Sequence, residues 1–284
     1  METEQKTYEH KGIKKGLYLI PTAFTAANIA MGFFAVLYSI RGFRLIDSPE
    51  QAGVYFNYAA VAIGFAILFD TLDGRIARMT RTATEIGVQF DSLADVLTFG
   101  IAPIALMYSW GLASVFPEGS KELGFATFLL FMYLMCGAFR LARFNIQATR
   151  PRVLLEGSQK VDKKNFVGLP IPPAAGLLAA IVHYANPPLS SYGDTGRYLA
   201  VLIMVLLAVL GLLMVSTVRY SSMKTLGSGR NNLYLVLVVA AIGMLMWLYS
   251  EYVLLILAVA YVSHGVIWYL FSMLTRKRSS EPPA

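Results

Sequence analysis

Four aspartates stand at fixed spacing across two apolar segments of this chain. Asp70 and Asp73 lie in the stretch Asp70-Thr-Leu-Asp73-Gly74-Arg75-Ile-Ala77-Arg78, and the other two follow in Gly87-x3-Asp91-x3-Asp95. Carboxylates are costly inside a bilayer, so ionisable residues in apolar segments mark functional sites there. The pattern therefore predicts that the four aspartates form the working site of a membrane protein.

Helical geometry would bring the two acid pairs together. At about 100° per residue, Asp70 and Asp73 project from nearly the same face of one predicted helix, bordered by the small residues Gly74 and Ala77. Gly87, Asp91 and Asp95 follow at intervals of four residues, so they share one stripe of the next predicted helix. Because the first helix descends to the cytoplasm and the second rises from it, the four carboxylates can converge near the inner membrane face.

Four carboxylates at close range would repel one another unless cations neutralised them. An oxygen-only donor set without nearby Cys or His favours Mg²⁺, Mn²⁺ or Ca²⁺ over zinc or copper. Mg²⁺ held by a few carboxylates leaves positions for water and substrate phosphate, which suits a diphosphate substrate. Two ions sharing the acids could clamp the attacking and leaving oxygens of a displacement at phosphorus.

Two alternatives use the same residues differently. The acids could pair with Arg75, Arg78 and Arg81 in a network that holds helices together, or they could mark the proton or cation pathway of a transporter. The neighbouring glycine and alanine favour a site that a nucleotide approaches, because a salt-bridge network needs no notch of small residues. The second half of the chain also carries no mirrored Asp cluster, as an inverted-repeat transporter would.

The composition predicts that membrane-spanning helices position these acids. Apolar residues make up 56% of the chain, the mean hydropathy is +0.57, and charged residues make up 14%, against about 25% in a soluble domain. We therefore predict an all-α integral membrane protein. Stretches long enough to span hydrocarbon number about eight, or seven if a short one is excluded; they lie near 18–40, 54–78, 87–110, 123–146, 170–187, 197–217, 232–249 and 252–274.

The basic residues predict the orientation. With both termini in the cytoplasm, all of the 24 Lys and Arg residues except Arg41, Arg44, Lys121 and Arg197 fall on the cytoplasmic side. The net charge of +7 then reflects membrane anchoring rather than nucleic-acid binding, since it sits in short juxtamembrane loops. We expect a cytoplasmic or interfacial segment at 1–16, one membrane domain at 17–275 and a cytoplasmic tail at 276–284.

The acid pattern resembles the signature of the CDP-alcohol phosphotransferases, Asp-x2-Asp-Gly-x2-Ala-Arg-x8-Gly-x3-Asp-x3-Asp, which this chain matches at every fixed position. The resemblance implies an integral membrane enzyme that transfers the phosphatidyl group of a CDP-linked lipid to an alcohol and releases CMP. It implies Mg²⁺ or Mn²⁺ as cofactor, Asp70, Asp73 and Asp91 as metal ligands, and Asp95 as general base and additional ligand. It further implies that the cytidine diphosphate is bound by Asp70, Gly74, Ala77, Arg78 and Gly87.

Three stretches outside the signature resemble the serine-using branch of that family: Pro21–Asn28 with Gly32, Cys136–Asn145 and Gly168–Ala175. A fourth, weaker one is Val215–Tyr220. Because serine carries a carboxylate, its pocket needs a cation, and the candidates are Arg140, Arg143 and Arg219, with Asn145 as a polar partner. Anchoring at the inner face is the alternative role of the arginines.

Thr25 and Asn28 share a face of the first predicted span and could hydrogen-bond cytidine, although bonding between helices is an alternative role. The segment from Gly168 to Pro173 could be only a proline-broken entry into a helix.

Together with these residues, the family resemblance implies transfer of the phosphatidyl group of CDP-diacylglycerol to L-serine by direct, metal-assisted displacement. No Ser or Cys stands in a nucleophilic triad, which favours attack by the acceptor hydroxyl itself. Glycerol 3-phosphate or inositol phosphate remain alternative acceptors, kept open by the basic loop at 150–164. A location in the inner or plasma membrane of a prokaryote is expected, with the site facing the cytoplasm and, as the family resemblance implies, a homodimeric chain.

Overall fold

The computed structural model describes residues 6–80, 85–149, 165–221 and 243–278, and these are almost entirely helical. The labelled elements are the helices α1 (Lys6–Arg44), α2 (Pro49–Thr80), α3 (Glu85–Asp95), η1 (Val96–Ile101), α4 (Ala102–Met107), η2 (Tyr108–Leu112), α5 (Ala113–Val115), α6 (Lys121–Thr149), α7 (Ile171–Ala185), η3 (Leu189–Tyr192), α8 (Asp194–Val215) and α10 (Ser250–Arg278), with the strands β1 (Asn165–Val167) and β2 (Arg219–Ser221). Among them η1 and η2 are π-helical, and η3 is a 3₁₀ helix.

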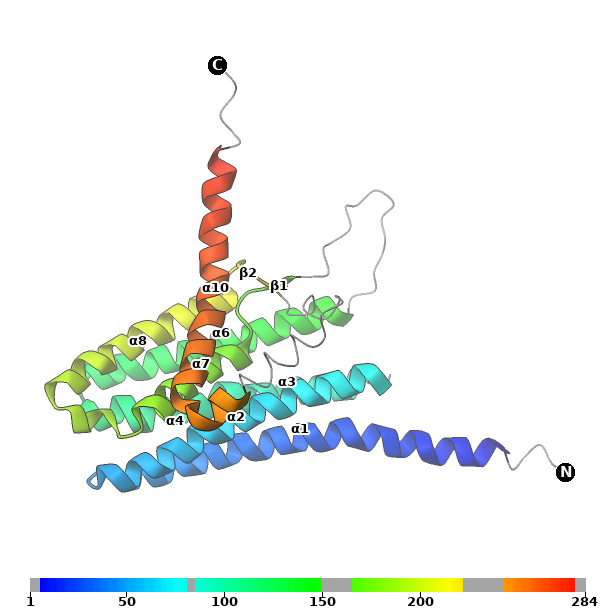
Figure 1. Cartoon of the computed structure of the whole chain (residues 1–284), viewed down its shortest axis with the longest axis horizontal. Coiled ribbons are helices and arrows are strands. Elements are labelled where there is room, and N and C mark those ends of the chain that lie inside the picture. Colours follow the sequence, from blue (N-terminus) through cyan, green and yellow to red (C-terminus); the bar gives the residue numbers. More distant parts are fainter. Residues whose placement is uncertain (1–5, 81–84, 150–164, 222–242, 279–284) are drawn as a thin grey trace, which may run out of the picture.

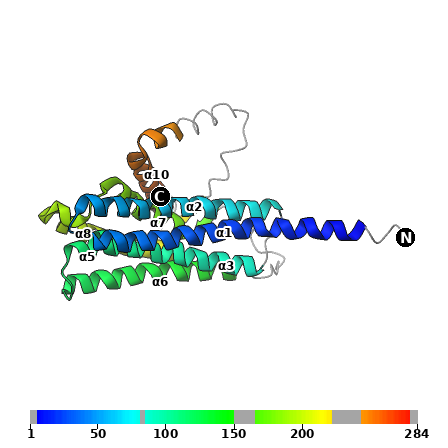
Figure 2. The same ribbon diagram turned by 90° about the horizontal axis from the view of Figure 1, so that it is seen from below.

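The long helices lie side by side and form a bundle, as Figures 1 and 2 show for α1, α2, α6 and α8. Five described helical segments are long and apolar enough to cross a membrane: Thr22–Arg44, Pro49–Ile76, Ile86–Val115, Lys121–Ile146 and Asp194–Val215. They coincide with five of the predicted spans, so the all-helical membrane architecture is confirmed. The third of them runs continuously through α3, η1, α4, η2 and α5.

The remaining predicted spans have different outcomes. Residues 170–187 fold as α7, which is apolar but only 15 residues long. Most of the predicted span at 232–249 lies outside the described residues. The last one corresponds to α10, which in Figure 1 runs steeply across the direction of α1, α2, α6 and α8 and contacts α7 and β2.

Small residues let α1 and α2 approach closely. Ala35 of α1 and Ala52, Ala59 and Ala66 of α2 are completely buried. A Cβ at Gly42 would lie 2.6 Å from the ring of Phe56, so only glycine fits there. Because lipid tails are as apolar as leucine, close packing of backbones is a main source of cohesion between membrane helices. This contact fixes α2, which carries the first acid pair.

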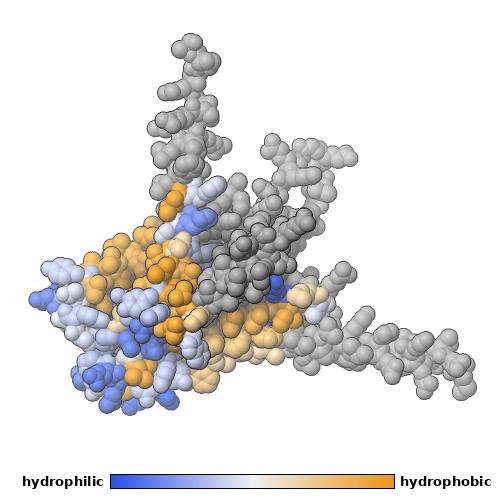
Figure 3. All heavy atoms as spheres, in the orientation of Figure 1, coloured by the Kyte–Doolittle hydropathy of each residue, from blue (hydrophilic) through white to orange (hydrophobic). Residues whose placement is uncertain are grey.

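Large apolar side chains lie both inside the bundle and on its flanks. Trp110, Tyr133, Phe56 and Phe99 are fully buried at the centre, whereas many other bulky apolar residues point outwards, among them Phe33, Phe65, Phe128 and Leu212. In Figure 3 hydrophobic residues cover the visible flank, and hydrophilic residues gather at the end where α1 turns into α2. An apolar flank of this kind matches a lipid environment.

The entry into α7 depends on one glycine. Gly168 has φ +84°, and its amide donates to the carbonyl of Val218 at 2.8 Å, while the Leu169 amide donates to Leu213 O at 3.0 Å. Helix α7 starts after the extended residue Pro170, with proline in its first turn. The predicted proline-led helix entry is therefore present. The two backbone hydrogen bonds at this entry tie the start of α7 to the end of α8, beside the antiparallel pair formed by β1 and β2.

Gly168→Ala is expected to lower the thermal unfolding temperature markedly. The left-handed backbone costs an L-residue about 1–2 kcal/mol, and a Cβ would lie 2.3 Å from the carbonyl oxygen of Met214. Gly119→Ala is the matched control, because Gly119 has φ +81° but nothing within 4 Å of its Cβ position. Thermal unfolding of detergent-purified protein measures both variants. Equal shifts would show that crowding at Gly168 contributes nothing.

Candidate active site

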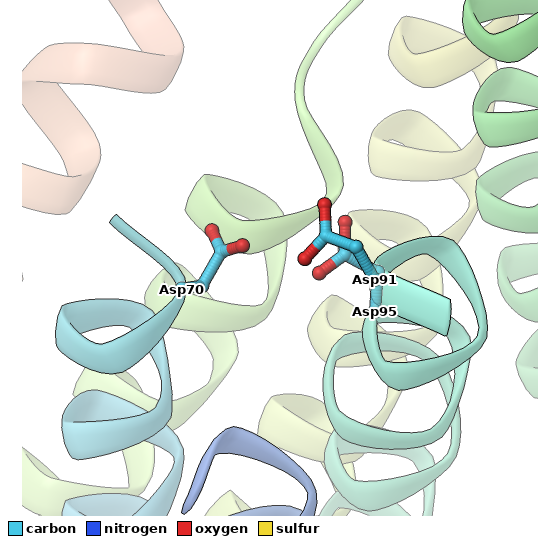
Figure 4. A group of neighbouring side chains, drawn as sticks. All are labelled: Asp70, Asp91 and Asp95. Carbon is cyan, nitrogen blue, oxygen red and sulfur yellow. The ribbon is translucent and has the colours of Figure 1, made fainter. Parts of the chain in front are cut away.

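Three of the four predicted acids meet in space. One carboxylate oxygen each from Asp70, Asp91 and Asp95 lies within 4.8 Å of the other two. Figure 4 shows Asp70 projecting from α2 toward the carboxylates of Asp91 and Asp95, which extend from successive turns of the facing helix α3. The helical spacing read from the sequence therefore places acids from two helices around one point, as predicted.

The cluster is shielded from water to different degrees. Asp95 is 8% exposed, whereas Asp70 and Asp91 are half-buried. Oδ1 of Asp95 is buried and has no hydrogen-bond partner among the described residues. The negative charges of Asp70, Asp91 and Asp73 all act on Asp95, and the positive charge of Arg140 opposes them. A concentration of carboxylates with one cation nearby calls for further positive charge.

The donor set suits a hard divalent cation. Three carboxylates with a buried, unpartnered oxygen offer oxygen ligands, and the described residues place no Cys or His in the group. Mg²⁺ is commonly held by one or two carboxylates together with substrate phosphates and water. Asp70 and Asp91 are only half-buried, so their carboxylates are partly accessible to such groups.

Asp73 lies one turn along α2 from Asp70 and is 3% exposed. Its Oδ2 accepts a hydrogen bond from the hydroxyl of Thr25 in α1 at 3.0 Å. Thr25 therefore has the interhelical bond that was one of its two predicted roles. Asn28, one turn further along α1, is completely buried, and neither atom of its side-chain amide has a partner among the described residues. A buried amide without a partner is costly, and a ligand that paired with it would remove that cost.

The small residues of the signature lie next to the acids along their helices. Gly74 follows Asp73 in α2 and is half-buried, and Gly87 is exposed one turn before Asp91 in α3. Ala77 and Arg78 belong to the last turns of α2, and their side chains lie outside the described part of the structure. The roles of these four residues stay predictions.

Arg140 and Arg143 occupy different environments on α6. Arg140 is 8% exposed, lies within electrostatic reach of Asp95 and of Tyr261 in α10, and its Nε has no hydrogen-bond partner among the described residues. The guanidinium of Arg143 donates to the carbonyl of Val215 at 3.4 Å, at the end of α8. The structure thus brings Arg140 within electrostatic reach of Asp95 and gives Arg143 a contact that closes a helix end.

Asn145 joins α6 to α3. Its Nδ2 donates to Oγ of Ser92 at 2.8 Å, directly beside Asp91 in sequence. Arg219 pairs through its backbone with Val167 in the β1–β2 ladder, and its side chain lies outside the described part. Sequence reasoning missed Ser92 and Tyr261. Ser92 occupies a variable position of the signature, and Tyr261 lies about 120 residues beyond Arg140 in α10, so neither carried a signal of its own.

The span that carries Asp91 and Asp95 also has an apolar outer face. Leu93 and Leu97 follow Asp91 and Asp95 along the same span and are 63% and 46% exposed. Residues two positions apart on a helix point to nearly opposite sides, so these leucines face outward while the acids of the same span face Asp70. The arrangement suits divalent-cation chemistry on a phosphorylated lipid.

Comparison with known proteins agrees with the signature. The family described as CDP-alcohol phosphatidyltransferase matches residues 18–211. A CDP-diacylglycerol–serine O-phosphatidyltransferase of Helicobacter pylori is 32% identical over 257 residues, covering 90% of this chain and 93% of that protein. A protein of the same name from Methanocaldococcus jannaschii is 32% identical, covering 69% and 70%, and the archaetidylserine synthase of Methanothermobacter thermautotrophicus is 30% identical, covering 74% and 72%. The chain belongs to the CDP-alcohol phosphatidyltransferase family.

Proposed function

We propose that this chain transfers the phosphatidyl group of CDP-diacylglycerol to the hydroxyl of L-serine, giving phosphatidylserine and CMP. The observation that carries the proposal is a buried arginine, Arg140, beside a cluster of three carboxylates, in a chain that aligns over 90% of its length with a relative named for this reaction. The acids suit the diphosphate, and the arginine suits an acceptor that carries a carboxylate.

The acid cluster is the proposed catalytic centre. Asp70, Asp91 and Asp95 would hold Mg²⁺ or Mn²⁺, and Asp73, one turn after Asp70 on α2, would complete the ligand set. A bound ion would neutralise the diphosphate and stabilise the charge that develops on departing CMP. Asp95 removes the proton of the serine hydroxyl. The serine oxygen then forms a bond to the lipid-side phosphorus as the bond from that phosphorus to the CMP oxygen breaks.

The CDP moiety is proposed to lie between α1, α2 and α3. Gly74, Ala77 and Gly87 leave room for the nucleotide to approach the backbone. Arg78 contacts its phosphates, for which a planar guanidinium is well suited. Thr25 and Asn28 face the cytidine, and the completely buried amide of Asn28 supports this assignment.

The acceptor is proposed to bind on the α6 side of the cluster. Arg140 receives the serine carboxylate, with Asn145 as a neutral polar partner and Arg143 and Arg219 nearby. The burial of Arg140 and its position next to Asp95 support its role. The contacts of Arg143 with Val215 and of Asn145 with Ser92 give those two residues a structural role as well.

Metal-dependent CMP release by purified protein tests the reaction. We expect release with CDP-diacylglycerol and L-serine, and little with glycerol 3-phosphate or inositol phosphate. Removing divalent ions with EDTA should abolish it, and Mg²⁺ or Mn²⁺ should restore it. Activity confined to a phosphorylated acceptor would contradict the serine assignment. A cation or proton-coupled transporter using the same acids would form no CMP at all.

The proposed setting is a membrane domain at 17–275 with eight spans, both termini in the cytoplasm and the site facing the cytoplasm. The distribution of Lys and Arg supports this orientation. Labelling single cysteines from each side of sealed vesicles tests it. We also propose a homodimer, which rests on the family resemblance, and light scattering of the detergent-solubilised protein measures its mass.

A further inference from the structure

The helix that carries Asp91 and Asp95 changes its winding immediately after Asp95. Residues Val96–Ile101 form the π-helix η1, and the amide of Ala102 donates to the carbonyl of Leu97, five residues earlier. In an α-helix this bond would span four residues. Turns of this wider type are rare and are frequently found at functional sites.

The wider turn lets the residues before it face the acid cluster and the residues after it face the core of the bundle. It accommodates one additional residue, and one residue corresponds to a rotation of about 100° in an α-helix. Asp91 and Asp95 before the turn can therefore face Asp70, while Leu106 and Trp110 after it face the core. Within η1 itself, three consecutive residues are buried, namely Thr98, Phe99 and Gly100. The turn is therefore surrounded by neighbouring helices on more than one side.

Helix α1 holds the turn from one side. The hydroxyl of Thr98 donates to the backbone carbonyl of Asn28 at 3.3 Å. A Cβ at Gly32, one turn further along α1, would lie 2.5 Å from Oγ1 and 2.9 Å from Cα of Thr98. The two helices thus approach as closely as a glycine allows, and the hydrogen bond ties them together at that point.

Helix α6 holds the turn from another side. Tyr133 is completely buried, and its hydroxyl donates to the carbonyl of Phe99 at 3.3 Å. In the core of a membrane bundle no bulk water is available to backbone groups, so a side-chain donor to a carbonyl of an irregular turn favours that turn over alternatives. The bonds from Thr98 to Asn28 and from Tyr133 to Phe99 therefore link η1 to α1 and α6, two helices that supply none of the three clustered carboxylates.

We propose that Tyr133 and Thr98 are positioning residues that hold the wider turn in register and thereby aim Asp95 at Asp70 and Asp91. Neither residue belongs to the proposed set of substrate and metal contacts. The inference rests on the proposed function, because kcat is its readout. Loss of either hydroxyl removes one of the two bonds that fix η1 against its neighbours, so the segment that carries Asp95 can shift away from the cluster.

The test compares Tyr133→Phe and Thr98→Val with two controls. Each variant removes one hydroxyl and keeps the volume of the side chain. We expect kcat to fall about tenfold, since small misplacements of catalytic groups have effects of this size, while KM for both substrates changes little. Thr98→Ser keeps the hydroxyl and should retain wild-type kcat. Tyr192→Phe removes a hydrogen bond from a tyrosine hydroxyl to the carbonyl oxygen of Ala185, 2.9 Å away at the C-terminal end of α7. This variant should also leave kcat unchanged.

The positioning role has a readout apart from turnover. Mn²⁺ binding, followed by electron paramagnetic resonance, should weaken in Tyr133→Phe and Thr98→Val and stay unchanged in both controls. Wild-type kcat in Tyr133→Phe and Thr98→Val would overturn the inference, and so would a fall equalled by Tyr192→Phe. A rise in KM at constant kcat would also overturn it, because it would indicate a binding role. If the wild-type protein released no CMP with serine, the proposed function would fail instead, and Mn²⁺ binding would still test the turn.

Discussion

Asp95→Asn is expected to lower kcat by about 10³-fold, in the range that loss of a positioned general base produces. Asparagine has nearly the same shape as aspartate but cannot accept the proton of the serine hydroxyl. It also removes the most buried charge of the three-carboxylate cluster, at a residue that is 8% exposed. Steady-state CMP release with saturating CDP-diacylglycerol and serine measures the effect.

The control separates loss of chemistry from loss of binding. Asp47→Asn makes the same exchange at an exposed residue in the turn between α1 and α2, and should leave kcat unchanged. Asp95→Asn should still bind CDP-diacylglycerol with an affinity within about threefold of wild type, because other groups would hold the nucleotide and lipid. Turnover near the wild-type level would remove Asp95 from the role of base.

Arg140→Gln is expected to raise KM for serine about 100-fold, which corresponds to about 2.7 kcal/mol, the scale of a hydrogen bond to a charged group. The guanidinium is buried beside Asp95, and its Nε has no partner among the described residues. A carboxylate is the ligand that a planar guanidinium binds best. KM for CDP-diacylglycerol should change little.

Arg143→Gln is the matched control, because the guanidinium of Arg143 donates to Val215 O. We expect it to lower the thermal unfolding temperature more than it changes KM for serine. Serinamide, an acceptor without a carboxylate, sharpens the test, because wild type and Arg140→Gln should have the same KM for it. If Arg140 only balanced the charge of the acids, Arg140→Gln would strengthen Mn²⁺ binding, because a positive charge near the cation is lost, and would leave the preference for serine over serinamide intact.

The acid cluster was predictable because it depends on local geometry. Spacings of three and four residues place Asp70 beside Asp73 and Asp91 beside Asp95 on any helix, and hydropathy places both helices in the membrane. The apolar spans were predictable because hydropathy averaged along the chain is also a local property of the sequence. The hydrogen bond between Thr25 and Asp73 depends on how α1 packs on α2, so the sequence could only leave two roles open for Thr25.

Other features depend on contacts distant in sequence. The wider turn after Asp95 has one local marker, Pro103, which has no amide to donate to the carbonyl of Phe99 four residues earlier. Its side-chain and backbone partners, Tyr133 and Asn28, lie on other helices. The steep course of α10, which brings Tyr261 near Arg140, depends on packing against α7 and β2. The partnership of Asn145 with Ser92 likewise follows from the crossing of α6 and α3. Periodicity within one helix contains none of this information.

The exposed leucines Leu93 and Leu97 put the outer face of the acid-bearing span at the apolar surface of the bundle, and this bears on how the concentrations of the two substrates would be expressed. If lipid chains stay in the bilayer while the head group reaches Asp91 and Asp95, the lipid is encountered in two dimensions and serine in three. The rate then follows the mole fraction of CDP-diacylglycerol among membrane lipids, whereas it follows the molar concentration of serine in water. Diluting the membrane with inert lipid would slow such an enzyme, although adding buffer would leave its supply of lipid unchanged.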